Sequence, residues 1–163
     1  MLITEISAKE CEEILDRNGF GRLGCSRGDQ PYVVPIYFAF QSGRLYGYST
    51  VGRKIEWMRA NPKVCVEVDE VASHFAWISV ILSGRFQELP DTPEFKPERL
   101  NAQMLLEKRM LWWQIASAAG QLQGVGETEQ PVFYTIHIDS ITGHRAAPDP
   151  IDSQFSRIAE IQA

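Results

Sequence analysis

One stretch decides the fold: YGYSTVGRKIEWMRANPKVCVEVD, residues 46–69. It predicts a strand, a Ser/Thr/Gly turn, a short amphipathic helix and a second strand. Asn61-Pro62 ends the helix, because the residue before a proline disfavours helical backbone. In the second strand, valines alternate with polar residues from 64 to 69, which is typical of a strand buried on one face.

The start of this short helix has an unusual charge. Helix N-termini carry partial positive charge and favour acidic side chains, but here Arg53 and Lys54 occupy the first turn. Just before them come small polar residues and a glycine: Ser49, Thr50 and Gly52. Amides, hydroxyls and two cations at one point favour a bound anion, most naturally a phosphate. The simpler alternative is a solvent-exposed turn that carries two basic residues.

Length and charge limit the classes of protein. A chain of 163 residues suits one domain with a real core. A net charge of -5 and a pI near 5.2 argue against sequence-independent nucleic-acid binding. No apolar run reaches the length of a membrane span, and the N-terminus lacks a signal-peptide pattern, so we expect a cytoplasmic protein. Cys11, Cys25 and Cys65 fit neither a disulfide framework nor a zinc site, and we expect reduced, mostly buried thiols.

The rest of the chain predicts an α+β protein. Ser7 to Glu10 has the form of a capping box, and the helix that it opens ends at Asn18-Gly19. A second, longer helix is predicted over 98–119, a polar loop over 121–130, and a turn at 142–145. The six predicted strands are 20–25, 32–40, 44–48, 64–69, 77–89 (bent at Gly84) and 132–139. Their meander order favours a small antiparallel barrel over residues 1–146, followed by a tail, 147–163, that is weakly helical over 153–161.

Two strands carry residues with alternative interpretations. Pro31 and Pro35 lie in or beside the second strand, and because proline cannot donate to a ladder, one side of this strand is predicted to be unpaired. Its free backbone groups could face solvent or a ligand. Acidic residues cluster at the end of the fourth strand, but no histidine has a fitting spacing, so we interpret them as surface charge and predict no metal site: Glu67, Asp69 and Glu70.

Five blocks of sequence go beyond these generic patterns. They are PYVVPIYF (31–38), LYGYSTVGRKI (45–55), NPKVCVEVDE (61–70), WISVILSGRFQEL (77–89) and ITGHRA (141–146). In this order and spacing the chain resembles the pyridoxamine 5'-phosphate oxidase-like flavin proteins over about residues 5–146, and it looks most like their nitroimidazole-resistance branch. The resemblance implies an FMN-binding split barrel of six antiparallel strands with flanking helices. It also implies a homodimer with two flavins in the clefts between subunits.

The resemblance also implies a set of cofactor-binding residues. Arg53 and Lys54 would hold the 5'-phosphate, and Arg145, in a Gly-His-Arg turn, would correspond to the family's Gly-Lys turn near the flavin. The isoalloxazine wall would be Val33, Val34, Pro35 and Ile36. The residues that follow the third strand would be Tyr48, Ser49 and Thr50. The residues that close the site from the long fifth strand would be Trp77, Ser79 and Val80.

One position departs from the family pattern. The nitroimidazole-resistance branch has a histidine where this chain has Tyr48, and neither His74 nor His144 is an obvious replacement. A tyrosine can stack or donate a hydrogen bond, but it is not a base near neutral pH. Flavin binding is still expected, whereas nitroreduction of that type loses its support. We do not locate the substrate-phosphate set of arginine and histidine residues of the vitamin-forming oxidase in this sequence, so we do not predict pyridoxal phosphate synthesis.

The leading hypothesis is an FMN-dependent oxidoreductase that acts on a small molecule stacked on the flavin near Tyr48 and Trp77. NADH and NADPH are the candidate electron donors. The alternative is a module that binds flavin, a deazaflavin or haem without turnover, as a sensor, carrier or store. For haem, the candidate axial ligands are His74, His137 and His144. A purely structural interaction protein is a third hypothesis.

Overall fold

The computed structural model describes residues 1–109 and 131–149. These residues form seven strands and three helices. The helices are α1 (Ala8–Arg17), α2 (Arg53–Ala60) and α3 (Lys96–Glu107). The strands are β1 (Leu2–Glu5), β2 (Phe20–Arg27), β3 (Gln30–Gln41), β4 (Arg44–Ser49), β5 (Lys63–Ser73), β6 (Ala76–Glu88) and β7 (Val132–Ala147).

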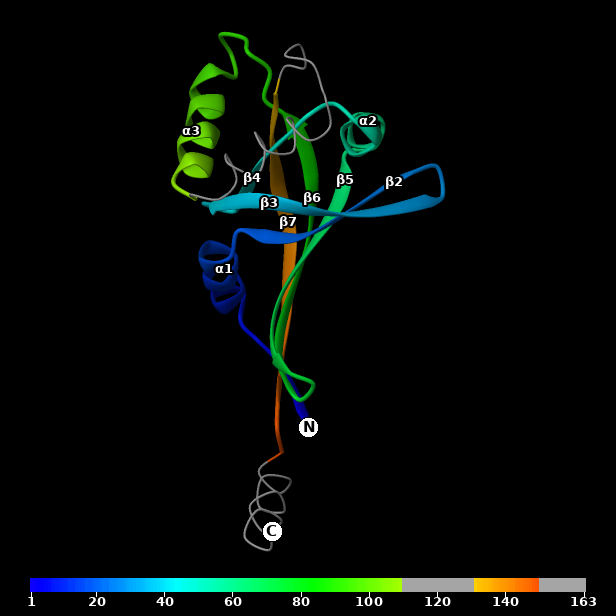
Figure 1. Ribbon diagram of the computed structural model, residues 1–163, viewed down its shortest axis with the longest axis vertical. Helices are drawn as coiled ribbons and strands as arrows, with labels where there is room; N and C mark the ends of the chain where they lie inside the picture. The colour runs from blue at the N-terminus through cyan, green and yellow to red at the C-terminus, as the bar shows by residue number, and fades with distance from the viewer. Residues whose placement is uncertain (110–130, 150–163) are drawn as a thin grey trace, which may run out of the picture.

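Six of the strands close into a barrel. The sheet has the order β1-β7-β4-β3-β2-β5-β6, and β6 also pairs with β7, so that strands β2 to β7 form a ring. All the pairings are antiparallel. Figure 1 shows the long β5, β6 and β7 running nearly vertically, with β2 and β3 crossing them. The predicted α+β split barrel is confirmed.

The barrel is split between β3 and β4. These neighbours pair only from Phe38 to Gln41, although β3 begins at Gln30. Beyond Phe38 the two strands diverge, and β4 continues along β7 as far as Ser49. The split therefore leaves one edge of β3 open, as the prolines predicted.

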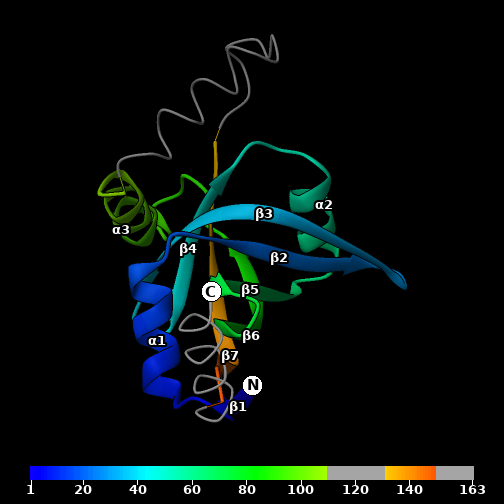
Figure 2. The same ribbon diagram turned by 60° about the horizontal axis from the view of Figure 1, so that its bottom comes forward.

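The helices cover the barrel on different sides. In Figure 2, α1 and α3 lie on one side of the strands and α2 lies on the other. α1 buries Cys11, Ile14 and Leu15, and α2 buries Ile55 and Met58. Both sets pack into the main core, whereas a smaller cluster lies under α3: Ala39, Tyr46, Leu89, Ala102, Leu106 and Phe133. Burial of these apolar faces, rather than local helix propensity, holds the short helices in place.

The local signals at the ends of α1 are confirmed. The Ser7 hydroxyl accepts a hydrogen bond from the Glu10 amide at 3.3 Å, and the Glu10 carboxylate accepts one from the Ser7 amide at 3.1 Å. This capping box provides partners for two backbone N–H groups that a helix N-terminus otherwise leaves unpaired. Asn18 ends the helix in an extended conformation. A Ser/Glu spacing was therefore sufficient to place the start of the helix.

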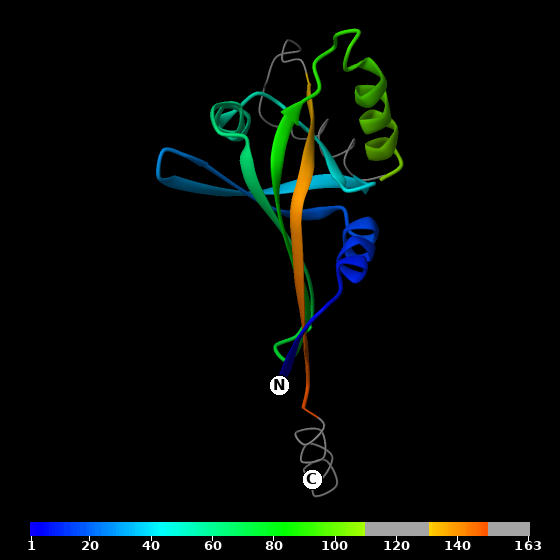
Figure 3. The same cartoon turned by 180° about the vertical axis from the view of Figure 1, so that it is seen from behind.

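The first half of β7 was predicted correctly as a strand over 132–139, but its second half was not. Residues 142–145 do not turn out of the strand but continue it, pairing with β6 on one side and with β1 on the other. The Ile6 amide donates to the Gly143 carbonyl at 2.9 Å, and Cys11 and Ile6 side chains fill the space beside the glycine. Figure 3 shows β6 and β7 side by side along most of their length. Pairing by distant strands overrode the local Thr-Gly signal.

Other boundaries also differ from the prediction. β1 was not predicted, because its four residues are all exposed and carry no alternation. β5 extends to Ser73, so His74 lies in a tight turn rather than in a longer connection. At Gly84, where a bend was predicted, the register of β6 against β7 shifts between Ser83 and Gly84. The later part of the predicted helix over 98–119, the loop over 121–130 and the helical part of the tail over 153–161 lie outside the described residues.

Candidate functional site

The two basic residues at the start of α2 lie over the same pair of residues in the barrel wall. The Arg53 guanidinium carbon is 5.4 Å from the centre of the Tyr32 ring. Lys54 is half-buried and close enough to the Cys25 thiol for each charge to affect the other. Cys25 and Tyr32 are directly opposite each other on β2 and β3. The predicted convergence of the two cations is therefore consistent with the fold.

The electrostatics at this point favour an anion. Burial lowers the pKa of the Lys54 ammonium, because a half-buried cation loses hydration. Gly52 is the N-cap of α2 and offers no side-chain hydrogen bond to the amides of the first turn. Within residues 1–109 and 131–149, neither Arg53 nor Lys54 forms an ion pair with a carboxylate. Six other arginines there do: Arg17, Arg22, Arg44, Arg59, Arg85 and Arg145.

The open edge of β3 begins next to these cations. From Gln30 to Tyr37 the strand pairs with β2 on one side, and among the described residues no strand pairs with its other side. The Val33 side chain is 65% exposed and Pro35 is exposed, whereas Val34 is half-buried and Ile36 is buried in the core. Among the described residues, backbone groups along this edge therefore have no strand partner.

Residues at the end of β4 lie on the far side of the split. The Ser49 hydroxyl donates to the Thr50 carbonyl at 3.0 Å. The Tyr48 ring packs edge-on against Phe133, with ring centres 5.3 Å apart, in the cluster under α3. Burial raises the pKa of the Tyr48 hydroxyl. Tyr48 therefore does not act as a base near neutral pH, as the sequence indicated.

A second group of predicted residues lies on the long arm that β5, β6 and β7 form beyond the barrel. Trp77 and Arg145 line a cavity of about 380 Å³ with Glu70 and Ile78. The Ser79 hydroxyl donates to Glu67 at 3.1 Å, and Arg145 contacts Glu10 at 3.3 Å. The Val80 side chain is fully buried in the barrel core, so only its backbone could face a ligand.

One copy of the chain does not bring the two groups together. Val33 on β3 pairs with Gly24 on β2, which pairs with Cys65 on β5, which in turn pairs with Ser83 on β6. Val33 and Ser83 therefore lie at the same level of the sheet, three strands apart. Trp77 lies six residues further along β6, which at about 3.3 Å per residue adds roughly 20 Å. Figures 1 and 3 show α2 at one end of the molecule and the β5–β6 turn at the other.

Sequence comparison assigns the chain to a family. The model of a family described as pyridoxamine 5'-phosphate oxidase matches residues 7–145. The chain belongs to this family. It is 40% identical over 146 residues to an uncharacterized protein of Rhizobium meliloti (strain 1021), covering 90% of this chain and 97% of the relative. The resemblance expected from the five sequence blocks is confirmed.

Solved structures agree with this assignment. A crystal structure described as a FAD-binding protein from Mesorhizobium loti is 40% identical, with a TM-score of 0.73, and the match covers 91% of this chain and 99% of that one. A FAD-binding protein from Mycobacterium smegmatis is 21% identical, with a TM-score of 0.60 and coverage of 87% and 98%. A protein described as a 5-nitroimidazole antibiotic resistance protein from Bacteroides thetaiotaomicron is 18% identical, with a TM-score of 0.64 and coverage of 88% and 87%. The last two, both under 25% identical, show the shared fold alone.

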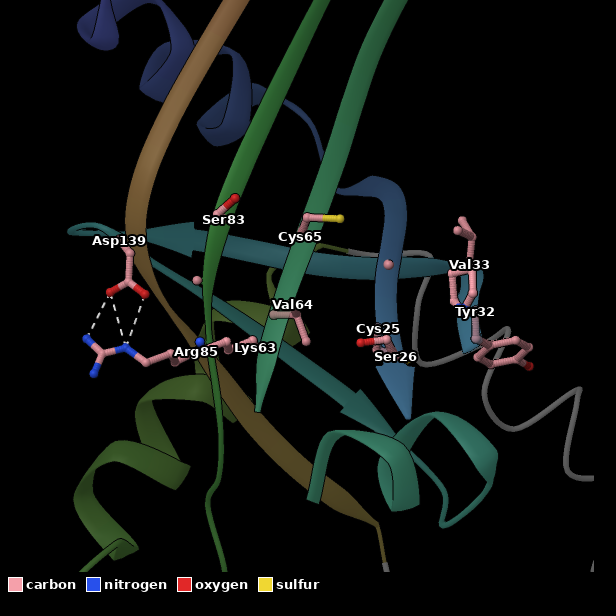
Figure 4. A pocket seen from close by; sticks show the side chains of 13 residues that line it. Cys25, Ser26, Tyr32, Val33, Lys63, Val64, Cys65, Ser83, Arg85 and Asp139 are labelled. Carbon is pink, nitrogen blue, oxygen red and sulfur yellow. Dashed lines mark hydrogen bonds and ion pairs between the residues drawn. The ribbon is translucent and has the colours of Figure 1, made fainter. Parts of the chain in front are cut away.

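The protein also carries a groove of about 510 Å³, which the sequence did not predict. Figure 4 shows Tyr32 and Val33 at one end and Arg85 at the other, where Arg85 pairs with Asp139 at 2.8 Å. Cys11 and Cys25 are buried, which agrees with the expectation of mostly buried thiols, whereas Cys65 lines the groove and is exposed. Its alternation with buried valines on either side is the signal that marks it as outward-facing.

The carboxylates of the acidic cluster have structural partners. Glu67 and Asp69 both accept from Arg22, and Glu70 accepts from Arg17 and Asn18. These contacts agree with the interpretation of the acidic cluster as surface charge.

The three histidines have different surroundings. His137 Nε2 lies 2.7 Å from Gln87 Oε1, and burial together with Arg44 lowers the pKa of its imidazole. His74 and His144 are exposed.

Among the helices within residues 1–109 and 131–149, none has the length and apolarity to cross a membrane.

Proposed function

We propose that this chain is an FMN-binding flavoprotein that catalyses oxidation or reduction of a small molecule. The observation that carries the proposal is the Arg53–Lys54 pair at an uncapped helix N-terminus beside the open edge of β3. A half-buried cation without a carboxylate partner is costly, and a bound phosphate would offset that cost. The open edge offers backbone groups to the flavin ring.

The choice of FMN over FAD rests on charge. FMN ends in a phosphate monoester that carries close to two negative charges at neutral pH, which two cations and the first-turn amides of α2 would match. The diphosphate of FAD carries one charge on each phosphorus. The Mesorhizobium loti relative is described as FAD-binding, so the test must distinguish the two nucleotides.

The protein would bind and orient the cofactor. A bound flavin supplies hydride or single-electron transfer. Backbone groups of β3 from Val33 to Ile36 would hold the ring, and Ser49 and Thr50 would lie between the ring and the phosphate. No strong acid or base from the protein is required, which is consistent with the half-buried, edge-on packing of Tyr48. The substrate and a nicotinamide donor, NADH or NADPH, would use the exposed face of the ring.

A homodimer would complete this site. Trp77, Ser79 and Arg145 lie on the long arm, far from Arg53 in the same chain, so the arm of a second copy would have to supply them. Large apolar side chains are exposed on the outer surface of the strands and at the tip of the arm: Phe20, Val33, Tyr37, Val71, Phe75 and Ile81. The rings of Phe20 and Tyr37 are in contact, with centres 5.1 Å apart, and contiguous exposed apolar surface favours a protein contact.

Mass spectrometry and absorbance of the purified full-length protein test the cofactor. We expect FMN, visible by its flavin bands, at one per chain. Replacing Arg53 and Lys54 together with Ala should remove it, whereas a double replacement of Lys9 and Arg27, which changes the net charge equally, should not. Full FMN occupancy after the first change, or an intense Soret band, would contradict the proposal. Stopped-flow reduction by NADH or NADPH then separates an enzyme from a binding module.

Mixing two defective variants tests the dimer. One variant lacks Arg53 and Lys54, and the other has Trp77 and Arg145 replaced with Ala. If each site uses both copies, the mixed dimer contains one intact site of two, and flavin binding should return to about half of the wild-type level. Light scattering should show two chains per particle. No recovery in proven mixed dimers, or a monomer that binds FMN fully, would overturn the shared site.

A module without turnover remains a second candidate because of one observation. The family branch with a histidine at position 48 has a base near the ring, and the Tyr48 ring here packs against Phe133 instead. A flavin carrier or sensor would bind FMN with the same residues but show no reduction by nicotinamide nucleotides. Haem is less well supported, because the half-buried histidine, His137, is already paired with Gln87.

A further inference from the structure

We propose that Tyr32 is a positioning residue that holds the Arg53 guanidinium in the orientation needed to bind the flavin phosphate. The inference rests on the proposed function and concerns how the protein prepares that site. Tyr32 is not among the residues that the sequence or the family resemblance assigned to the cofactor.

The Tyr32 ring of β3 contacts two residues of α2, Arg53 and Trp57. The Arg53 guanidinium carbon lies 5.4 Å from the centre of the Tyr32 ring. The Tyr32 ring in turn packs against the Trp57 ring, with centres 5.4 Å apart and planes tilted by 57°. Arg53 and Trp57 are four residues apart on α2 and so share one face of the helix. Tyr32 therefore contacts the helix at both residues.

Contact through the ring face leaves the hydrogen-bonding edge of Arg53 available. A guanidinium above an aromatic ring is attracted by the negative face of the ring, while its N–H groups point outward in their own plane. Arg17 and Arg59 behave differently. Arg17 donates through two nitrogens to the Glu70 carboxylate, and Arg59 donates in the same way to Glu88. Those bonds fix an arginine but use its donors. Only the aromatic contact orients Arg53 without occupying the groups that a phosphate needs.

Preorganisation explains why this matters for affinity. Arg53 is exposed and has a long, flexible side chain. Ordering such a side chain on binding costs entropy, and a contact already formed in the free protein removes part of that cost. The Tyr32 hydroxyl has no part in this, so phenylalanine should replace tyrosine without loss.

The test compares FMN with riboflavin, which has the same ring but no phosphate. Dissociation constants are measured by fluorescence quenching on full-length protein freed of flavin. Replacing Tyr32 with Met should weaken FMN binding about fivefold and leave riboflavin binding unchanged. Tyr32→Phe should restore wild-type affinity. In an Arg53→Gln background, Tyr32→Met should have no further effect on FMN.

Each contrary result has a distinct meaning. An equal loss for FMN and riboflavin, or the same loss in the Arg53→Gln background, would show that Tyr32 only supports the fold and would overturn the inference. If the wild-type protein binds neither flavin, the proposed function itself fails and the inference fails with it. Wild-type FMN binding with an unchanged Tyr32→Met variant rejects the inference alone.

A second set of variants covers the case in which Tyr32→Met does not fold. Fluorinated phenylalanines at position 32 weaken the negative face of the ring with little change in shape. FMN affinity should fall stepwise with the number of fluorine atoms, while riboflavin affinity and the melting temperature stay constant. An FMN affinity that is flat across the series would overturn the inference.

Discussion

The two ends of α2 carry arginines with opposite surroundings. Arg59, in the last turn, donates two hydrogen bonds to Glu88, at 2.7 and 2.8 Å, and its positive charge suits a helix C-terminus. Arg53, in the first turn, has no carboxylate partner among the described residues, and its charge opposes the helix dipole. One end of the helix is arranged for stability. The other carries an electrostatic cost that only a bound anion would offset.

The largest expected effect is loss of the cofactor from the N-terminal end. Replacing both Arg53 and Lys54 with Ala should weaken FMN binding by a factor of about 100 or more, since each charge-assisted hydrogen bond contributes about 1.5–3 kcal/mol. Isothermal titration with FMN measures the change. Arg59→Ala is the matched control at the other end of the helix and should keep the wild-type affinity.

The second prediction concerns the stability of the flavin-free protein when the charge at the start of α2 is removed. Lys54→Met keeps the length of the side chain and removes a half-buried charge at a helix N-terminus. The flavin-free protein should therefore gain about 0.5–1 kcal/mol in free energy of unfolding. Urea denaturation checks this. A loss of stability would mean that Lys54 has a favourable partner and would remove the contrast between the two ends.

The third prediction is a loss of stability when the ion pair at the C-terminal end of α2 is broken. Arg59→Ala breaks a surface ion pair and should lower the free energy of unfolding by about 0.2–1 kcal/mol. Glu88→Gln should cause a similar loss, and the double variant should lose less than the sum. The same urea titrations measure it, and strictly additive losses would show that the pair contributes nothing.

The smallest effect is a dependence on alkaline pH. Burial holds the pKa of Lys54 in the folded, flavin-free protein below its ordinary value of 10.5. Between the lowered pKa of Lys54 in the folded protein and its ordinary value in the unfolded chain, the unfolded chain binds more protons than the folded one. The stability of the folded protein therefore rises with pH in that window. Wild-type protein should approach the stability of Lys54→Met as the pH rises toward 10.5. A constant difference between the two proteins would contradict a lowered pKa.

Parts of the fold followed from short-range patterns. The capping box from Ser7 to Glu10 placed α1, because its hydrogen bonds join residues three apart. Alternation placed β5, because the side chains of a strand point to opposite faces in turn. Pro35 indicated the open edge of β3 for an equally local reason, its missing N–H. β1 and the second half of β7 could not be predicted from local patterns. β1 is a strand because β7 pairs with it, and the second half of β7 is a strand because β1 and β6 pair with it.

The candidate site divides in the same way. The sequence by itself determined the cation pair at the start of α2, because the charge of a first turn can be recognised without its surroundings. Only the tertiary structure decided that Tyr32 lies under Arg53, that Cys25 lies beside Lys54, and that Trp77 and Arg145 are far from both. Those relations join segments from β2, β3, α2 and the long arm, and they depend on how the sheet closes into a barrel, which no local pattern of residues specifies.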